Sequence, residues 1–254
     1  MAKDNETNNS IPSDPITHVI FDLDGTLINS EKYLFKSINE ILMEFGKEYE
    51  WSVRAKTIGL HMAKSAPIIV EHFQLPITAD EYIQKVLKRF KAYVEGQIDD
   101  DKGVQLLPGV QRLVYHLAKH HIPMAICTGC MSDTYQYKTQ SFGDFFSKGK
   151  FFHHIVLAGS DPEIHERNKP DPTPYQVCMS RFDMKDGAKI LPHQVLVFED
   201  SPTGLTSAVR AGCRTVFLPD PKIDRNSLAV KPDVILNSML EFEPEMFGLP
   251  AFED

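Results

Sequence analysis

Residues 16–26 read Ile-Thr-His-Val-Ile-Phe-Asp-Leu-Asp-Gly-Thr and decide the fold class. The run from Ile16 to Phe21 is short, apolar and rich in β-branched residues, so it predicts a buried strand. The run stops at Asp22, and Asp24 follows two residues later. Both acids are therefore expected at the carboxyl end of the strand. The competing interpretation is an ordinary turn, in which Asp and Gly merely tolerate the backbone conformation.

Further apolar runs follow much later in the chain, and helical patterns separate them. The runs are 123–128, 154–158, 194–199, 215–218 and 234–236, and the helical patterns are 110–120, 172–182 and 202–211. Strands that alternate with helices predict an α/β protein, with a Rossmann-like parallel sheet covered by helices on both faces. In such sheets the chemistry collects at the carboxyl ends of the strands.

The stretch 30–101 breaks this alternation, because it contains only helical periodicity and the capping box Thr78-x-x-Glu81. It predicts an inserted all-helical cap. The expected organisation is a disordered tail at 1–14, a Rossmann-like core at 15–29 and 102–254, and a cap at 30–101. The acidic stretch 99–103 is a candidate hinge.

Polar residues follow several of the predicted strands. Thr128 ends one, Glu199 and Asp200 end another, and Lys169 precedes Pro170 between two strands. Parallel strand ends meet at one edge of a sheet, so these residues are expected to converge on Asp22 and Asp24. An ordered set of this kind makes the simple turn interpretation a poor one.

Each member of the set has a task in phosphoryl transfer. A carboxylate such as Asp22 attacks phosphorus without first losing a proton, and water later hydrolyses the acyl phosphate. Mg²⁺ prefers oxygen ligands such as Asp22 and Asp200, and it offsets the repulsion between carboxylate and phosphate. Lys169, the Thr128 hydroxyl and the loop at Gly129 would bind the phosphate oxygens. Asp24 is placed to act as acid and then base.

These residues, in this order, resemble the four motifs of the haloacid dehalogenase superfamily, and the helical insert resembles its cap. The resemblance implies that Asp22 is the nucleophile and a magnesium ligand, and that Asp24 is the acid and base and a ligand through its backbone carbonyl. It further implies that Asp200 is the third protein ligand and that Glu199 holds a metal-bound water. The implied catalytic and phosphate-binding residues are Asp22, Asp24, Thr128, Gly129 and Lys169.

A closer resemblance, to the pseudouridine-5′-phosphatase group, extends from His18 to Glu253. It is carried by segments 107–110, 154–157, 169–172, 195–204 and 244–250, and the chain departs from the group at 60–62 and 128–130. The implied substrate is pseudouridine 5′-phosphate. The alternatives are a sugar-phosphate or glycerol-phosphate phosphatase, a mutase similar to β-phosphoglucomutase, and a binding module without activity.

The cap is expected to select the substrate, with residues 59–64 near the mouth of the pocket and His61 as a possible contact. Its aromatic residues offer stacking partners for a base, although their helical spacing also suits a hydrophobic core. These residues are Tyr33, Phe35, Trp51 and Tyr82.

The chain has 254 residues and a formal net charge of −8, which argues against a nucleic-acid polymer or an anionic membrane as partner. The expected partner is a small phosphorylated metabolite, and nothing in the sequence requires an oligomer. No apolar run is long enough for a membrane span, and no signal peptide is evident, so a cytoplasmic location is expected.

The four cysteines are too few and too scattered for a disulfide scaffold and are expected to be structural thiols.

Overall fold

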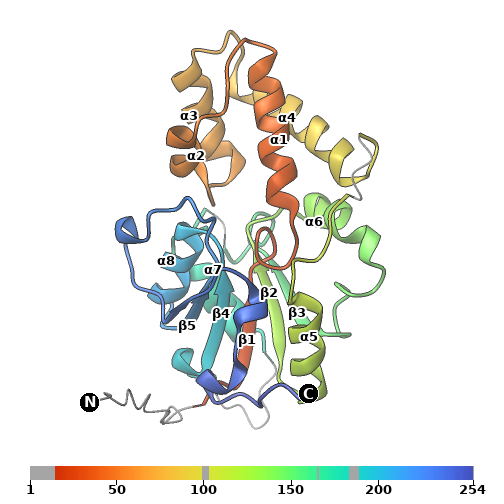
Figure 1. Ribbon diagram of the computed structural model, residues 1–254, viewed down its shortest axis with the longest axis vertical. Coiled ribbons are helices and arrows are strands. Elements are labelled where there is room, and N and C mark those ends of the chain that lie inside the picture. The colour runs from red at the N-terminus through yellow and green to blue at the C-terminus, as the bar shows by residue number, and fades with distance from the viewer. Residues whose placement is uncertain (1–14, 99–102, 165, 183–188, 254) are drawn as a thin grey trace, which may run out of the picture.

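We analysed a computed structural model, which describes residues 15–98, 103–164, 166–182 and 189–253. Its centre is a six-stranded parallel sheet in the order β3-β2-β1-β4-β5-β6 (Figure 1). The strands are β1 (His18–Phe21), β2 (Met124–Thr128), β3 (Phe152–Leu157), β4 (Val195–Glu199), β5 (Arg214–Phe217) and β6 (Val234–Ile235). The helices are α1 (Ser30–Met43), α2 (Trp51–Thr57), α3 (Met62–Phe73), α4 (Ala79–Val94), α5 (Val110–Lys119), α6 (Ser132–Thr139), α7 (Thr173–Ser180) and α8 (Pro202–Arg210).

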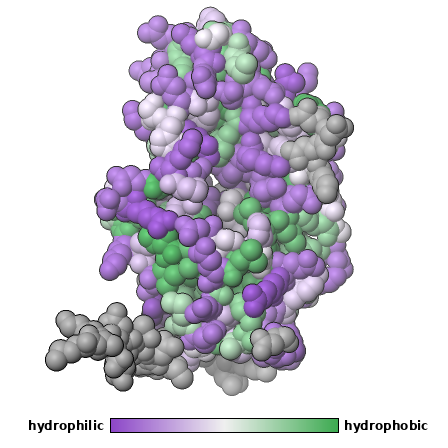
Figure 2. All heavy atoms as spheres, viewed as in Figure 1, coloured by the Kyte–Doolittle hydropathy of each residue, from purple (hydrophilic) through white to green (hydrophobic). Residues whose placement is uncertain are grey.

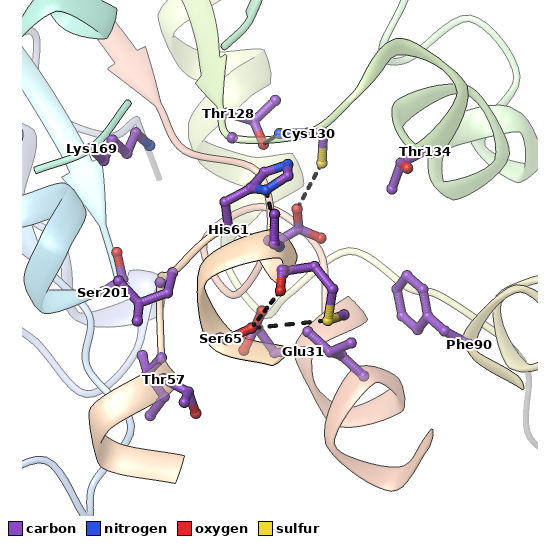
Figure 3. Close-up of a pocket in the computed structure, with 18 of the residues that line it drawn as sticks. Glu31, Thr57, His61, Ser65, Phe90, Thr128, Cys130, Thr134, Lys169 and Ser201 are labelled. Carbon is purple, nitrogen blue, oxygen red and sulfur yellow. Dashed lines mark hydrogen bonds between the residues drawn. The ribbon is translucent and has the colours of Figure 1, made fainter. Parts of the chain in front are cut away.

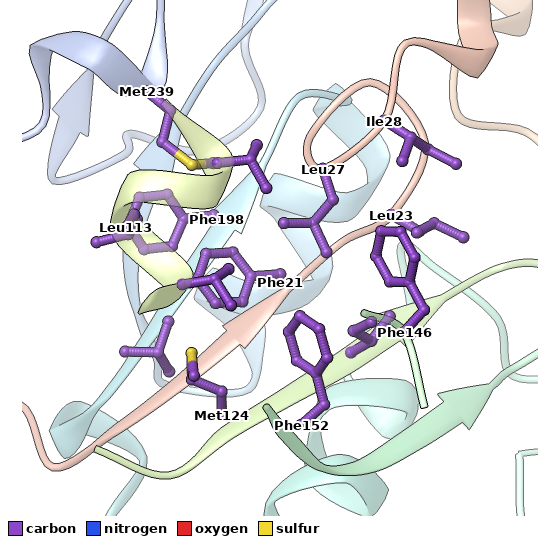
Figure 4. Close-up of a cluster of buried hydrophobic side chains, with 14 of the residues drawn as sticks. Phe21, Leu23, Leu27, Ile28, Leu113, Met124, Phe146, Phe152, Phe198 and Met239 are labelled. Atoms are coloured by element: carbon purple, nitrogen blue, oxygen red, sulfur yellow. The ribbon is translucent and has the colours of Figure 1, made fainter. Parts of the chain in front are cut away.

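Side chains of β1 alternate between the two faces of the sheet, as the strand period of two requires. Val19 and Phe21 belong to a hydrophobic cluster that includes α5 residues, whereas Ile20 belongs to a second cluster that includes residues of α7 and α8. In the first cluster the Phe21 ring stacks on Phe198 of β4, with ring centroids 5.0 Å apart (Figure 4). Helices therefore cover both faces of the sheet. The predicted α/β Rossmann-like class is confirmed.

Helices α1 to α4 lie together beyond the carboxyl ends of the strands (Figure 1). They share a hydrophobic cluster of their own, to which Leu42, Ile69 and Val86 contribute from α1, α3 and α4. The predicted capping box is present, because the Thr78 hydroxyl accepts from the Glu81 amide and the Glu81 carboxylate accepts from the Thr78 amide. The outer surface of this part is mostly hydrophilic in the view of Figure 2.

The predicted strands and helices agree with the observed ones to within a few residues. Gly212, which follows α8, has φ +86°, the left-handed conformation that favours glycine after a helix. The predicted tail at 1–14 and most of the candidate hinge at 99–103 fall outside the described residues, and the domain boundaries remain a prediction. Within the described ranges, no helix is long and apolar enough to cross a membrane.

Candidate active site

The strand ends of β1 and β4 place three carboxyl groups next to one another. Asp22 directly follows β1, Glu199 ends β4, and Asp200 comes next. One carboxylate oxygen of each lies within 4.8 Å of the others. The sheet therefore brings together the acids that the sequence separates by more than 170 positions.

Lys169 joins this group from the loop before α7. Its Nζ donates to Asp22 Oδ1 at 2.6 Å, to Glu199 Oε1 at 2.6 Å and to the Cys127 carbonyl at 2.9 Å. Burial alone would lower the pKa of Lys169, but the charges of Asp22 and Glu199 hold that pKa well above its usual range. The predicted convergence of Lys169 on Asp22 is thus present in the structure.

The local charge balance favours a bound cation. Burial raises the pKa of Asp22 to about 7 against the opposing effect of Lys169. Burial, with the charges of Asp22 and Glu199, also holds the pKa of Asp200 well above its usual range. Three carboxyl groups thus share one ammonium group, and a divalent cation would supply the missing positive charge. Oxygen donors of this kind fit Mg²⁺.

Gly25 explains how Asp200 comes so close to the first motif. Gly25 has φ +80°, and a Cβ built there would lie 2.1 Å from the Asp200 carboxylate. A side chain at this position would collide with a proposed metal ligand as well as strain the backbone.

The Asp24 carboxylate is held by partners other than Lys169. Its Oδ1 accepts from Lys138 Nζ at 2.7 Å and from the Ser30 hydroxyl, and its Oδ2 accepts from Cys130 Sγ at 3.1 Å. Burial disfavours the charged form of Asp24, but the ion pair with Lys138 and these hydrogen bonds outweigh burial and lower its pKa. A carboxylate so occupied leaves only the backbone carbonyl for a metal, as the family resemblance implies.

Glu199 is held by protein donors on both of its oxygens. Oε1 accepts from Lys169 and, at 2.5 Å, from the Tyr175 hydroxyl, and Oε2 accepts from the hydroxyl of Ser201 at 3.1 Å. Glu199 is fully buried. These contacts suit a residue that positions Lys169 and a water better than one that binds a metal directly.

A cavity of about 390 Å³ opens from these acids toward helices α1 to α4 (Figure 3). Thr128 and Gly129 line it at the end of β2, and their role in phosphate binding stays a prediction. Its apolar wall comes from α1, α3, α4 and the loop after α2, through Leu34, Phe35, Ile38, Ile58, Leu60, Met62, Ile83, Leu87 and Phe90. The site is therefore polar at the sheet and largely apolar at the helices.

Residues 59–63 of the segment expected at the pocket mouth line the cavity. Gly59 and His61 line the cavity, and so do Leu60, Met62 and Ala63 between and after them. Burial lowers the pKa of His61, and Lys64 adds to the effect. A role of His61 in substrate binding stays a prediction.

Of the four aromatic residues considered as stacking partners, Phe35 alone is among the described residues that line the cavity. Tyr33 and Tyr82 are buried, with 1% and 0% of their surface exposed. Their helical spacing therefore reflects packing, the alternative that the sequence left open.

The cysteines are structural thiols, as predicted. Cys127, Cys130, Cys178 and Cys213 are all buried and unpaired with one another. Cys130 lines the cavity, where burial raises the pKa of its thiol to about 12, so it acts as a hydrogen-bond donor.

Two charged residues of the cavity escaped the sequence analysis. Glu31 shares a helical stripe with Leu34 and Ile38, at spacings of three and seven, so a charge on an apolar face was a usable signal. Lys138 lies on α6 and meets Asp24 across 114 positions of sequence. No motif or spacing pointed to Lys138.

Comparison with known proteins gives a consistent result. The profile of the family described as haloacid dehalogenase-like hydrolase matches residues 19–218. The chain is 38% identical to (DL)-glycerol-3-phosphatase 2 of Arabidopsis thaliana, over 94% of each chain. It is 34% identical to a probable pseudouridine-5′-phosphatase of Drosophila melanogaster, over 94% of this chain and 96% of that one.

Among solved structures, CbbY from Rhodobacter sphaeroides in complex with phosphate superimposes with a TM-score of 0.66 at 21% identity. The match covers 89% of this chain and 96% of that one. It supports the shared fold.

Proposed function

Since the chain belongs to the haloacid dehalogenase-like hydrolase family, we propose that it is a magnesium-dependent phosphatase that works through an aspartyl-phosphate on Asp22. The observation that supports this most is the buried group of Asp22, Glu199 and Asp200 around Lys169. A binding module without activity would keep these acids at a cost in stability and gain nothing from them.

In the first step Asp22 attacks phosphorus and the leaving alkoxide departs on the opposite side. Lys169 orients the Asp22 carboxylate and places positive charge beside the incoming phosphate oxygens. The Thr128 hydroxyl and the loop at Gly129 donate to the same oxygens. Asp24 takes up a proton as the ester binds and donates it to the leaving alkoxide, which departs as the alcohol and leaves Asp24 ionised.

In the second step Asp24 is a carboxylate and takes a proton from the water that hydrolyses the aspartyl-phosphate. The contacts of Asp24 with Lys138, Ser30 and Cys130 favour this ionised form. Glu199 positions Lys169 throughout.

Mg²⁺ would be held by the carboxylates of Asp22 and Asp200 and the backbone carbonyl of Asp24, with Glu199 holding a metal-bound water. When bound, the ion offsets the negative charge of nucleophile and phosphate.

We further propose that residues 30–101 act as a cap and that the preferred substrate is pseudouridine 5′-phosphate. A cavity of about 390 Å³ falls in the range of pockets for ligands larger than a three-carbon alcohol. Its apolar wall, which includes Phe35 and Phe90, suits the flat face of a base. The 34% identity with the Drosophila protein supports the same substrate.

Glycerol phosphate is the second candidate. The 38% identity with the Arabidopsis glycerol-3-phosphatase extends over the same share of this chain. Other phosphorylated sugars, and a mutase reaction, are further alternatives.

A panel of substrates tests the proposal. Phosphate release with Mg²⁺ should be compared as kcat/KM for pseudouridine 5′-phosphate, uridine 5′-phosphate, glycerol 3-phosphate and glucose 6-phosphate. Pseudouridine 5′-phosphate should give the highest ratio. A clear preference for glycerol 3-phosphate would identify the protein as a glycerol-phosphate phosphatase instead. Conversion of β-glucose 1-phosphate to the 6-phosphate would establish a mutase.

Removing the metal is a separate test. Excess chelator should stop phosphate release and added Mg²⁺ should restore it, whereas Ca²⁺, which is larger and less strict in geometry, should support less. Full activity in excess chelator would show that phosphate release does not require a metal ion.

A further inference from the structure

The two lysines of the cavity are both committed to acids at the sheet. Lys169 contacts Asp22 and Glu199, and Lys138 contacts Asp24 at 2.7 Å. The side chains of both lysines are less than 10% exposed. Neither ammonium group is available to a second anion on the substrate.

The helical side of the cavity offers no replacement for them. Among the described residues that line it, the helices and loops of 30–98 contribute one carboxyl group, that of Glu31, and one imidazole ring, that of His61. Burial raises the pKa of Glu31 to about 7. The other polar groups on that side are the neutral hydroxyls of Tyr49, Thr57 and Ser65. An anionic group there would meet no lysine or arginine of the described lining. Arg54, which stacks on Phe35 behind that lining, is already paired with Asp220.

Glu31 itself is free to contact a ligand. It stands in the first turn of α1 and points into the cavity near Ser65 (Figure 3). Its carboxyl group has no hydrogen-bond or ion-pair partner within the described ranges, unlike Asp24 and the three clustered acids. The same helix places Leu34 and Phe35 beside it on the apolar wall.

We propose that Glu31 and the helical side of the cavity, whose described lining carries no lysine or arginine, select phosphomonoesters whose leaving group is neutral and carries hydroxyl groups, and reject those with a second phosphate or a carboxylate. This inference rests on the proposed function and deepens it, because it assigns the charge and hydrogen-bonding character of the leaving group. Glu31 is then the specificity-determining residue, and a substrate hydroxyl is its hydrogen-bond partner.

The physical reason is the cost of burying charge. An anionic group in this cavity would lose its water and find a carboxyl group and apolar side chains in exchange. A hydroxyl group in the same place pairs with Glu31 and satisfies both partners. Both candidate substrates, a nucleoside monophosphate and glycerol phosphate, have a neutral leaving group of this kind.

Two matched pairs of substrates test the selection. Glycerol 3-phosphate and 3-phosphoglycerate differ by a hydroxymethyl group against a carboxylate, and 2-hydroxyethyl phosphate and 2-phosphoglycolate differ in the same way. The neutral member of each pair should exceed the anionic one in kcat/KM by about 100-fold or more. Equal kcat/KM values within both pairs would overturn the inference.

Variants at Glu31 test the residue. Glu31→Lys should raise the anionic-to-neutral ratio by about 100-fold, and Glu31→Gln, the milder change if the lysine variant folds poorly, should raise it by about 10-fold. Turnover of methyl phosphate, whose leaving group is too small to reach Glu31, reports any effect of the variants on the charges of Asp24 and Asp200, and the anionic-to-neutral ratio cancels such a common effect. Glu44→Lys is the matched control, because Glu44 follows α1, is partly exposed and pairs with Lys85. An unchanged ratio in both Glu31 variants would overturn the inference.

A binding measurement separates this inference from the proposed function. If the folded protein hydrolyses no phosphomonoester at all, methyl phosphate included, the proposed function fails. Calorimetric titration of glycerol 3-phosphate and 3-phosphoglycerate with Mg²⁺ still decides the selection, because it needs no turnover. Tighter binding of the neutral ligand supports the inference, and equal or weaker binding of it overturns the inference.

Discussion

Asp24 and Lys138 form the ion pair on which the proposed proton transfers depend. Their atoms are 2.7 Å apart, and the side chains are 18% and 8% exposed. The pair sits beside Cys130, whose protonated thiol donates to the other Asp24 oxygen. These contacts hold the Asp24 carboxylate in place and lower its pKa, so they favour its ionised form.

Replacing Lys138 should therefore slow every substrate alike. We expect Lys138→Met to lower kcat by about 100-fold on methyl phosphate and on larger esters, because general acid and base catalysis typically contributes at least that much. Lys138→Arg keeps the charge and should recover part of the loss. Steady-state kinetics on folded variants measures this. A loss confined to the larger esters would instead make Lys138 a contact of the leaving group.

The site residues that could be predicted from the sequence are those that end or directly follow a predicted strand. Asp22, Thr128 and Glu199 end or follow apolar runs, so their meeting at one edge follows from the parallel sheet alone. Lys138 could not be found this way, because it lies on a helix and reaches Asp24 only through tertiary packing. Glu31 was recoverable, since a charge interrupts an apolar helical stripe.

At the scale of elements, α2 and the loop after it contact the first turn of α8 and the loop that follows β5. Arg54 of α2 pairs with Asp220 at 2.8 Å and stacks on Phe35, 3.4 Å from its ring centroid. The Thr203 hydroxyl donates to the Gly59 carbonyl at 3.1 Å. Gly59 has φ +74°, and a Cβ there would lie 2.2 Å from Thr203 Oγ1. These contacts tie the helical part to the sheet part beside the cavity.

The Arg54–Asp220 pair should favour the arrangement in which the cavity is covered. Its side chains are 22% and 27% exposed, so the pair is expected to contribute about 1 kcal/mol. Arg54→Met and Asp220→Asn should each lower kcat/KM about fivefold, and the double variant should lose little more. A double-mutant cycle measures the coupling. Fully additive losses would show that the two residues act independently.

The elements themselves were largely predictable from local pattern. Apolar runs located all six strands, and the capping box located the start of α4. What pattern did not supply was the packing between segments, such as Arg54 on Phe35, because it depends on side-chain geometry between elements distant in sequence.

At the scale of the whole molecule, two buried histidines make the fold sensitive to acid. His18 on β1 and His154 on β3 are 7% and 6% exposed and both pack against Phe182. Burial, with a contribution from His153, lowers the pKa of His18 to about 4. Burial also lowers the pKa of His154 to about 4, although a hydrogen bond to the Cys178 carbonyl opposes it. His154 is buried because β3 packs against α7, whose Cys178 carbonyl lies 2.9 Å from its Nε2.

Both histidines are neutral in the folded protein and take up protons on unfolding once the pH falls below about 6.5. Their contribution to the free energy of unfolding is therefore present above that pH and is lost between about 6.5 and 4. At pH 5 the loss should be about 2 kcal/mol for each histidine.

Urea unfolding at pH 7 and pH 5 measures this loss. Between pH 7 and pH 5 the free energy of unfolding of His18→Phe should fall by about 2 kcal/mol less than that of the wild type. The exposed His72 is the control site, and His72→Gln should behave as the wild type. If the free energy of unfolding of His18→Phe depends on pH as that of the wild type does, His18 does not contribute to the acid sensitivity.

The central claim is that the phosphoryl group is transferred to Asp22 as a covalent aspartyl-phosphate before water hydrolyses it. The most direct test is phosphate release from pseudouridine 5′-phosphate and glycerol 3-phosphate, with Mg²⁺, by the wild type and by Asp22→Asn. An amide is a far poorer nucleophile than a carboxylate, so the folded variant should lose activity by about 1,000-fold or more on both substrates. Phosphate release by folded Asp22→Asn at a rate near that of the wild type would contradict the account.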